Sequence, residues 1–180
     1  MPTRIHPELA SAFPRFAAAL AARPEEPYLV EHVLPAASEP DIRAIEVELG
    51  VPLPESYKRL LRLTRGFWLS SGVVQLGLEH PFFHEFEPYE ALTPQQRDGV
   101  RRKGGTWPPP SHGMLCFAEY FAEADGDQVL WDVRSGLQAG EYPVYYYSHE
   151  ARPPSVRCHA ENFAEWLDRC LDPFPPVERE

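Results

Sequence analysis

Apolar side chains recur at helical spacing near the start of the chain, at Phe13, Phe16, Ala17 and Leu20. Ser11 can cap such a helix, and Pro14 is tolerated in its first turn because the N–H groups there have no partner inside the helix. The pattern ends at Pro24. The sequence therefore predicts a short helix, in an N-terminal helical extension over residues 1–27.

A second helix is delimited at both of its ends. Ser38 can accept a hydrogen bond from the first turn, and Asp41 lies three residues further on, as in a capping box. The apolar stripe of this segment consists of Ile42, Ile45 and Leu49. Gly50 follows, and glycine is common just past a helix end. These signals predict a helix between Ser38 and Gly50.

A third helix is expected to follow a short proline-containing link. Pro54 suits the first helical position, where its missing N–H is no loss. The expected buried face consists of Tyr57, Leu60, Leu61 and Thr64. Gly66 is expected to end this helix. Two helices joined by so short a link form a helical hairpin, which needs another layer to pack against.

Strand patterns dominate most of the remaining chain. Residues 67–78 are β-like on both sides of Ser70-Ser71-Gly72 and predict a hairpin. The runs 114–117, 128–133 and 142–147 are joined by short links and favour an antiparallel meander. In the second run, Val129, Trp131 and Val133 alternate with Gln128, Leu130 and Asp132. The predicted fold class is α+β, with flanking helices packed on an antiparallel or mixed β-sheet.

The chain is expected to close with a helix. Its apolar stripe consists of Phe163, Trp166, Leu167, Cys170 and Leu171. Asn162 or His159 lies near its start, and residues 173–180 are expected to form a C-terminal tail. Residues 79–113 form a long excursion, rich in proline and aromatic residues, that can hold a short helix from Thr93 to Arg102.

Composition limits the possible partners. With 180 residues, of which 43% are hydrophobic, the chain can bury one core. No apolar run approaches the roughly 20 residues that span a bilayer, so no membrane association is expected. The three cysteines are widely spaced and odd in number, which fits a cytoplasmic protein better than a disulfide framework. A net charge of -10 argues against nucleic acid and favours a basic protein partner, although it also serves solubility alone.

No catalytic, metal or cofactor site is predicted. His80 and His84 lie four residues apart, but Pro81 disfavours the helix that a zinc pair needs, so a solvated loop is the preferred interpretation. Asp125 and Asp127 fit a tight turn better than a calcium loop, which needs a glutamate at its twelfth position. An enzyme whose site is spread over several loops is left as an alternative.

Two acidic clusters are the candidate binding residues. The first is Glu79, Glu85, Glu87 and Glu90, and the second is Glu119, Glu123, Asp125 and Asp127. Carboxylates can steer a basic partner, and nearby aromatic rings can anchor it. The partner-binding residues predicted from these clusters and rings are Glu85, Glu87, Glu90, Glu119, Glu123, Asp125, Asp127, Phe83 and Phe86.

Several short motifs occur in a recognisable order. They are the helix 38–50, Leu53-Pro54-Glu55-Ser56-Tyr57-Lys58, Gly66-Phe67-Trp68, Gly126-Asp127-Gln128-Val129-Leu130-Trp131-Asp132, Tyr142-Pro143-Val144-Tyr145 and Asn162-Phe163-Ala164-Glu165-Trp166-Leu167. Together they resemble the SUKH superfamily, the Smi/Knr-like domain, over residues 28–172. Arg65 replaces an asparagine that is frequent in that family before the glycine.

The resemblance implies a fold and a role. It implies a SUKH-like α+β domain without catalytic residues that, in bacteria, often acts as an immunity protein and neutralises a toxin, frequently a nuclease. An acidic inhibitor of a basic nuclease site is physically sensible, because carboxylates can replace phosphates there. The alternative is a regulatory or scaffold module, as in fungal regulators of cell-wall synthesis.

Overall fold

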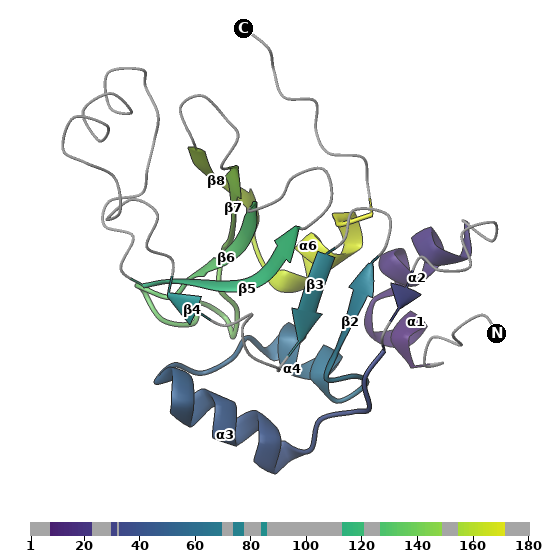
Figure 1. Ribbon diagram of the computed structural model, residues 1–180, viewed down its shortest axis with the longest axis horizontal. Coiled ribbons are helices and arrows are strands. Elements are labelled where there is room, and N and C mark those ends of the chain that lie inside the picture. The colour runs from purple at the N-terminus through teal and green to yellow at the C-terminus, as the bar shows by residue number, and fades with distance from the viewer. Residues whose placement is uncertain are drawn as a thin grey trace, which may run out of the picture.

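A single antiparallel sheet forms the centre of the computed structural model (Figure 1), which describes residues 8–22, 30–31, 33–69, 74–77, 84–85, 113–120, 127–148 and 155–171. Its strands are β1 (Val30–Glu31), β2 (Gly66–Leu69), β3 (Val74–Gly77), β4 (His84–Glu85), β5 (Met114–Tyr120), β6 (Gln128–Asp132), β7 (Val144–Ser148) and β8 (Ser155–Ala160). The order across the sheet is β1-β2-β3-β5-β6-β7-β8, and β4 also pairs with β5. Every one of these pairings is antiparallel, so the expected α+β fold is confirmed.

The predicted hairpin and meander are both confirmed. β2 and β3 pair with Leu69 opposite Val74, and β5, β6 and β7 are neighbours in chain order. β8 extends the meander by one strand. The sequence pattern does not predict β8, nor the two-residue strands β1 and β4, which are too short to show a periodicity. The expected helix 93–102 lies outside the described residues.

The sheet is apolar on both faces. Val129 and Trp131 belong to the main core, as their alternation predicts. Leu130 points to the opposite face, where it forms a second buried cluster with Met114, Cys116 and Val156. The alternation in β6 is therefore confirmed, but Leu130 does not face solvent.

Two short helices begin the described chain, α1 (Leu9–Ala12) and α2 (Pro14–Ala21). The expected cap is wrong, because Ser11 lies inside α1 and Phe13 occupies the N-cap position of α2. The buried positions are confirmed: Phe13 and Phe16 are each 1% exposed. The ring of Phe16 stacks on that of Phe67, and its N–H donates to Asp168 Oδ1 at 3.0 Å. These helices therefore share one core with the sheet.

Helix α3 (Glu39–Leu49) has the predicted bounds, and its capping box is confirmed. Ser38 Oγ accepts from the N–H of Asp41 at 3.3 Å, while Asp41 Oδ2 accepts from the N–H of Ser38 at 2.9 Å. Gly50 ends the helix with a φ of 69°, a left-handed conformation that glycine adopts without strain. Local sequence signals alone thus define this helix.

Helix α4 (Glu55–Leu61) is shorter than predicted. Pro54 is its N-cap rather than its first residue, and Gly66 belongs to β2. The helix ends early because Thr64 closes a turn: its hydroxyl donates to the carbonyl of Leu34 at 2.8 Å and accepts from the N–H of Gly66 at 3.2 Å. The predicted buried face is confirmed, since Tyr57, Leu60, Leu61 and Thr64 are all buried.

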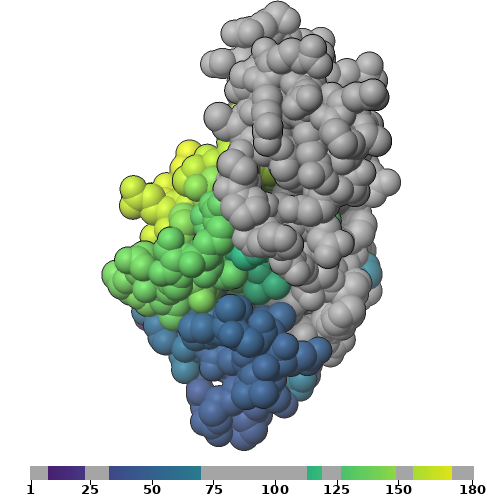
Figure 2. Space-filling model, turned by 90° about the vertical axis from the view of Figure 1, so that its left-hand side faces the viewer, coloured from purple at the N-terminus to yellow at the C-terminus, as the bar shows by residue number. Residues whose placement is uncertain are grey.

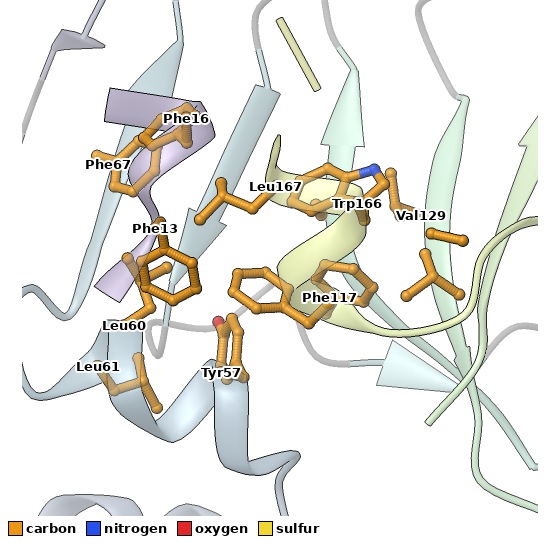
Figure 3. Packing of buried hydrophobic residues seen from close by; sticks show 14 of the residues in the cluster. Phe13, Phe16, Tyr57, Leu60, Leu61, Phe67, Phe117, Val129, Trp166 and Leu167 are labelled. Atoms are coloured by element: carbon orange, nitrogen blue, oxygen red, sulfur yellow. The ribbon is translucent and has the colours of Figure 1, made fainter. Parts of the chain in front are cut away.

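Helix α6 (Phe163–Arg169) closes the fold, with Asn162 rather than His159 as its cap. Its rings meet those of α4 and of the sheet in an aromatic cluster consisting of Tyr57, Phe117, Trp131, Phe163 and Trp166. Tyr57, Phe117 and Trp166 of this cluster are labelled in Figure 3. Phe117 stacks on Trp131 with ring centroids 4.2 Å apart, and Tyr57 meets Trp131 edge-on at 4.8 Å. All five residues of the aromatic cluster are 0% exposed, so it joins both helices to the sheet.

The N-terminus of α4 is capped from a distant turn. Pro54 has no side-chain acceptor, and Glu141 supplies one: its carboxylate accepts from Ser56 N–H at 2.8 Å and from Ser56 Oγ at 2.6 Å. The turn also brings the carbonyl of Gly140 to the N–H of Glu55. A β-carbon at residue 140 would lie 3.2 Å from Glu55 Cγ, and Gly140 has a φ of 83°, so glycine suits this contact.

We expect Glu141→Ala to lower the free energy of unfolding by about 1–3 kcal/mol, because it leaves a buried N–H without its acceptor. Urea unfolding followed by tryptophan fluorescence measures the loss. Glu161→Ala removes an exposed carboxylate and should change stability by less than about 0.5 kcal/mol. Equal effects of the two substitutions would contradict the capping role.

Candidate functional site

Asp127, one of the predicted partner-binding residues, lies inside the fold. It is 3% exposed, and its carboxylate accepts a hydrogen bond from the hydroxyl of Tyr146. Tyr146 lies on β7 and pairs in register with Val129, two residues after Asp127. A buried carboxylate needs such donors to offset its desolvation. Asp127 therefore acts within the fold, and the acidic surface must come from the other predicted residues.

Glu119 lies on β5, and Glu85 lies on β4, which pairs with β5. Glu119 is the register partner of Gln75 on β3 and of Gln128 on β6. Glu85, on β4, is the partner of Leu115. The register of the β5–β6 pair shifts between Cys116 and Ala118, so a β-bulge lies between Leu115 and Glu119. The backbone therefore places Glu85 and Glu119 beside different parts of β5, with the bulge between them.

The other predicted partner-binding residues lie outside the described part of the chain. They are Glu87, Glu90, Glu123, Asp125, Phe83 and Phe86. Of the two histidines considered as zinc ligands, His84 is the first residue of β4, and His80 lies outside the described residues. In the segments that are described, no group of three or more His, Cys, Asp or Glu could hold a metal ion.

A row of register partners crosses the sheet through the position of Glu119. It consists of Glu31, Trp68, Gln75, Glu119, Gln128, Tyr147 and Val156. Trp68 is 38% exposed, whereas burial of Tyr147 raises the pKa of its hydroxyl. This row is accessible at the β2 end and packs against the second apolar cluster at the β7 end. Sequence reasoning missed it, because only strand pairing aligns these positions.

Ion pairs hold α3 to α4. Glu39 Oε1 lies 2.6 Å from Arg62 Nε, and Glu46 Oε1 lies 3.4 Å from Lys58 Nζ. Asp41 pairs more loosely with Arg65, at 3.5 Å. The hydrogen bond from Arg62 holds the pKa of Glu39 below its usual range, and the bond from the Ser38 backbone does the same for Asp41. Arg65 thus has a structural partner here in place of the family's asparagine.

The outer side of α3 carries the most exposed large apolar side chain of the described residues. Val47 is 82% exposed, while Ile42 on the inner side is 1% exposed. Sequence reasoning assigned only the inner stripe of this helix. A second stripe of weakly apolar residues was visible in the sequence, but nothing in the sequence distinguishes it from an ordinary solvated face.

None of the three cysteines, which all lie in the described part of the chain, forms a disulfide: Cys116 is buried, Cys158 is exposed and Cys170 is half-buried. The pKa of the Cys158 thiol is raised by partial burial and by Glu165 and Glu161 nearby. None of the helices described here is both long and apolar enough to cross a bilayer.

We expect Asp127 and Tyr146 to be energetically coupled. Asp127→Ala and Tyr146→Phe should each lower the free energy of unfolding by about 1–3 kcal/mol. Because they share a buried hydrogen bond, the double variant should lose less than the sum, with a coupling of at least about 0.5 kcal/mol. Tyr145→Phe, on the other face of β7, is the control and should be additive with Asp127→Ala. Additive losses for the Asp127 and Tyr146 pair would contradict the assignment.

Comparison with known proteins identifies the fold. No curated protein matches the chain. The model of the SMI1 / KNR4 family (SUKH-1) matches residues 36–169, a range that contains α3, α4, α6 and all strands except β1. Domains of this family are protein-interaction modules and are generally non-catalytic. Because the match covers well over half of the chain, the chain belongs to the SMI1/KNR4 family (SUKH-1).

Proposed function

We propose that this protein is a cytoplasmic immunity protein that binds and neutralises a toxin protein with a basic surface, such as a nuclease. The observation that carries the proposal is the charge of the chain, 27 acidic against 17 basic residues, on the scaffold of a protein-interaction family. A net charge of -10 attracts a basic protein and repels nucleic acid.

The pairing of the basic residues strengthens this charge argument. In the described part of the chain, the cations bound to the protein's own carboxylates are Lys58, Arg62, Arg65, Arg134 and Arg169. Side chains that are engaged in this way offer little to a phosphate group. The surface therefore suits a cationic partner, whose capture such a field accelerates.

Two features supply the proposed contact surface. The first is the pair of acidic clusters without Asp127, which is buried. The second is the β2 end of the cross-sheet row, where Trp68 is 38% exposed and neighbours Gln75. Tryptophan is enriched among the residues that dominate binding energy at protein interfaces. Beyond Gln75 on β3, the row continues to Glu119 on β5, which adds a carboxylate. Binding there would block the toxin by covering it, without any chemistry on the inhibitor.

The direct test is coexpression with the product of the neighbouring gene. If that product is toxic, the proposal predicts that this protein restores growth and copurifies with it as a stable complex. Copurification with a harmless protein would instead favour the regulatory or scaffold module. Failure to protect cells from a toxic neighbour would contradict the proposal.

We expect Glu85→Lys, Glu87→Lys and Asp125→Lys, combined in one variant, to weaken toxin binding at least about tenfold at low salt, mainly through a slower association rate. The melting temperature should stay the same. The matched control is Glu25→Lys, Glu26→Lys and Glu161→Lys, which changes the net charge equally outside the two clusters. Surface plasmon resonance over a salt series measures both variants. An unchanged affinity of the first, or equal weakening by the control, would contradict a role of these clusters.

A further inference from the structure

Helix α3 presents two different sides. Its inner side packs on the core through Ile42, with Ile45 and Leu49 partly buried. Its outer side exposes Pro40, Ala44 and Val47, which follow one another at spacings of four and three residues. This is the spacing of the contact positions in a pair of parallel helices. The helix is thus built for contact on both sides, yet the described chain covers only one.

The position of α3 leaves the outer side accessible. In Figure 1 the helix lies at the margin of the fold, below the sheet, and the atoms of this part of the chain face the viewer in Figure 2. Val47, 82% exposed, is near the middle of the stripe. A large apolar side chain in this position gains free energy from any partner that removes it from water.

The charges beside this stripe differ from those on the inner side. Glu39, Asp41 and Glu46 are tied to Arg62, Arg65 and Lys58 of the same chain. Arg43 and Glu48, which flank the outer stripe on opposite sides, are exposed and form no ion pair within the described residues, although the charge of Arg43 helps to lower the pKa of Glu39 one turn earlier. They are five residues apart, directly before Ala44 and directly after Val47.

We propose that the outer side of α3 binds a second copy of this chain, with the two α3 helices parallel and related by a two-fold axis. In that arrangement each side chain on one flank faces the residue five positions further along on the opposite flank of the other helix. Arg43 of one copy therefore faces Glu48 of the second copy. The symmetry forms this ion pair twice. An isologous contact of this kind closes after two copies.

The same charges disfavour the alternative orientation. In an antiparallel pair equal flanks meet, so the two arginines would approach each other, as would the two glutamates. Like charges in such positions are destabilising. The apolar stripe alone would accept either orientation, and the flanking charges select the parallel one.

The size of the surface sets the strength of the association. Eleven residues of helix are about 16 Å long, so the contact is well below the roughly 800 Å² per partner of a stable complex. The dimer should therefore be weak and in rapid exchange, with its population rising with protein concentration. The residues of α3 used here belong to neither acidic cluster, and this inference does not rest on the proposed toxin.

The first test is sedimentation velocity of the full chain over a concentration series at low salt. The sedimentation coefficient of the wild type should rise with protein concentration. The sedimentation coefficient of Val47→Lys should stay at the value of the monomer at every concentration. Lysine is a better helix former than valine and suits the C-terminal part of a helix, so this variant should remain folded. Val33→Lys, at another exposed valine, should behave as the wild type. A monomeric wild type, or a dimer that Val47→Lys leaves intact, would overturn the proposal.

The second test examines orientation by exchanging charges. Arg43→Glu alone and Glu48→Arg alone should each weaken self-association about tenfold, because both symmetric ion pairs become repulsive. The double variant Arg43→Glu/Glu48→Arg should regain the wild-type constant, and an equimolar mixture of the two single variants should form a heterodimer. Arg59→Glu, an exposed arginine on α4, is the control without effect. No recovery in the double variant or in the mixture would overturn the parallel arrangement.

Discussion

The packing of one aromatic cluster determines how the layers of this protein meet. Tyr57 from α4, Phe117 and Trp131 from the sheet, and Phe163 and Trp166 from α6 are completely buried and contact one another in edge-on and stacked pairs. Such rings bury large apolar areas and add a preference for particular geometries. Phe13 extends the contacts to the N-terminal helices by meeting Phe163 edge-on. The sheet, both terminal helical segments and α4 therefore depend on the same set of contacts.

How well the fold can be predicted follows from the range of the interactions involved. Helix α3 and the cap of α6 are specified by residues within three positions, Ser38 with Asp41 and Asn162 with Glu165, and both predictions are confirmed. The end of α4 is not predictable in this way, because Thr64 bonds to Leu34, thirty residues away. β8 is not predictable from its own residues, because it forms by pairing with β7. The cap of α4 by Glu141 is not predictable either, because it joins residues that are far apart in the chain. Elements that depend on residues close together in the chain can thus be predicted from the sequence. Elements that depend on contacts between distant residues become visible only in the folded structure.

The same distinction explains the candidate site. The motifs that resemble the SMI1/KNR4 family supply Tyr57, Trp131, Phe163 and Trp166, which are four of the five buried residues of the aromatic cluster. They identify a fold, and function lies in the surface around it. Asp127 looked like a surface carboxylate because its partner, Tyr146, is on another strand. The bulge between Cys116 and Ala118 likewise lies between the register positions of Glu85 and Glu119 along β5, and no periodicity in the sequence predicts it. Recognition of an acidic interaction domain was possible from the sequence, but the arrangement of its surface was not.

The aromatic cluster, and not the surface, holds the fold together. Equilibrium urea unfolding of Phe117→Ala tests this directly, because Phe117 contacts Tyr57, Trp131, Phe163 and Trp166. The predicted result is a loss of about 3–5 kcal/mol in the free energy of unfolding, or a chain that no longer folds. A loss below about 0.5 kcal/mol, as expected for an exposed residue, would contradict the account.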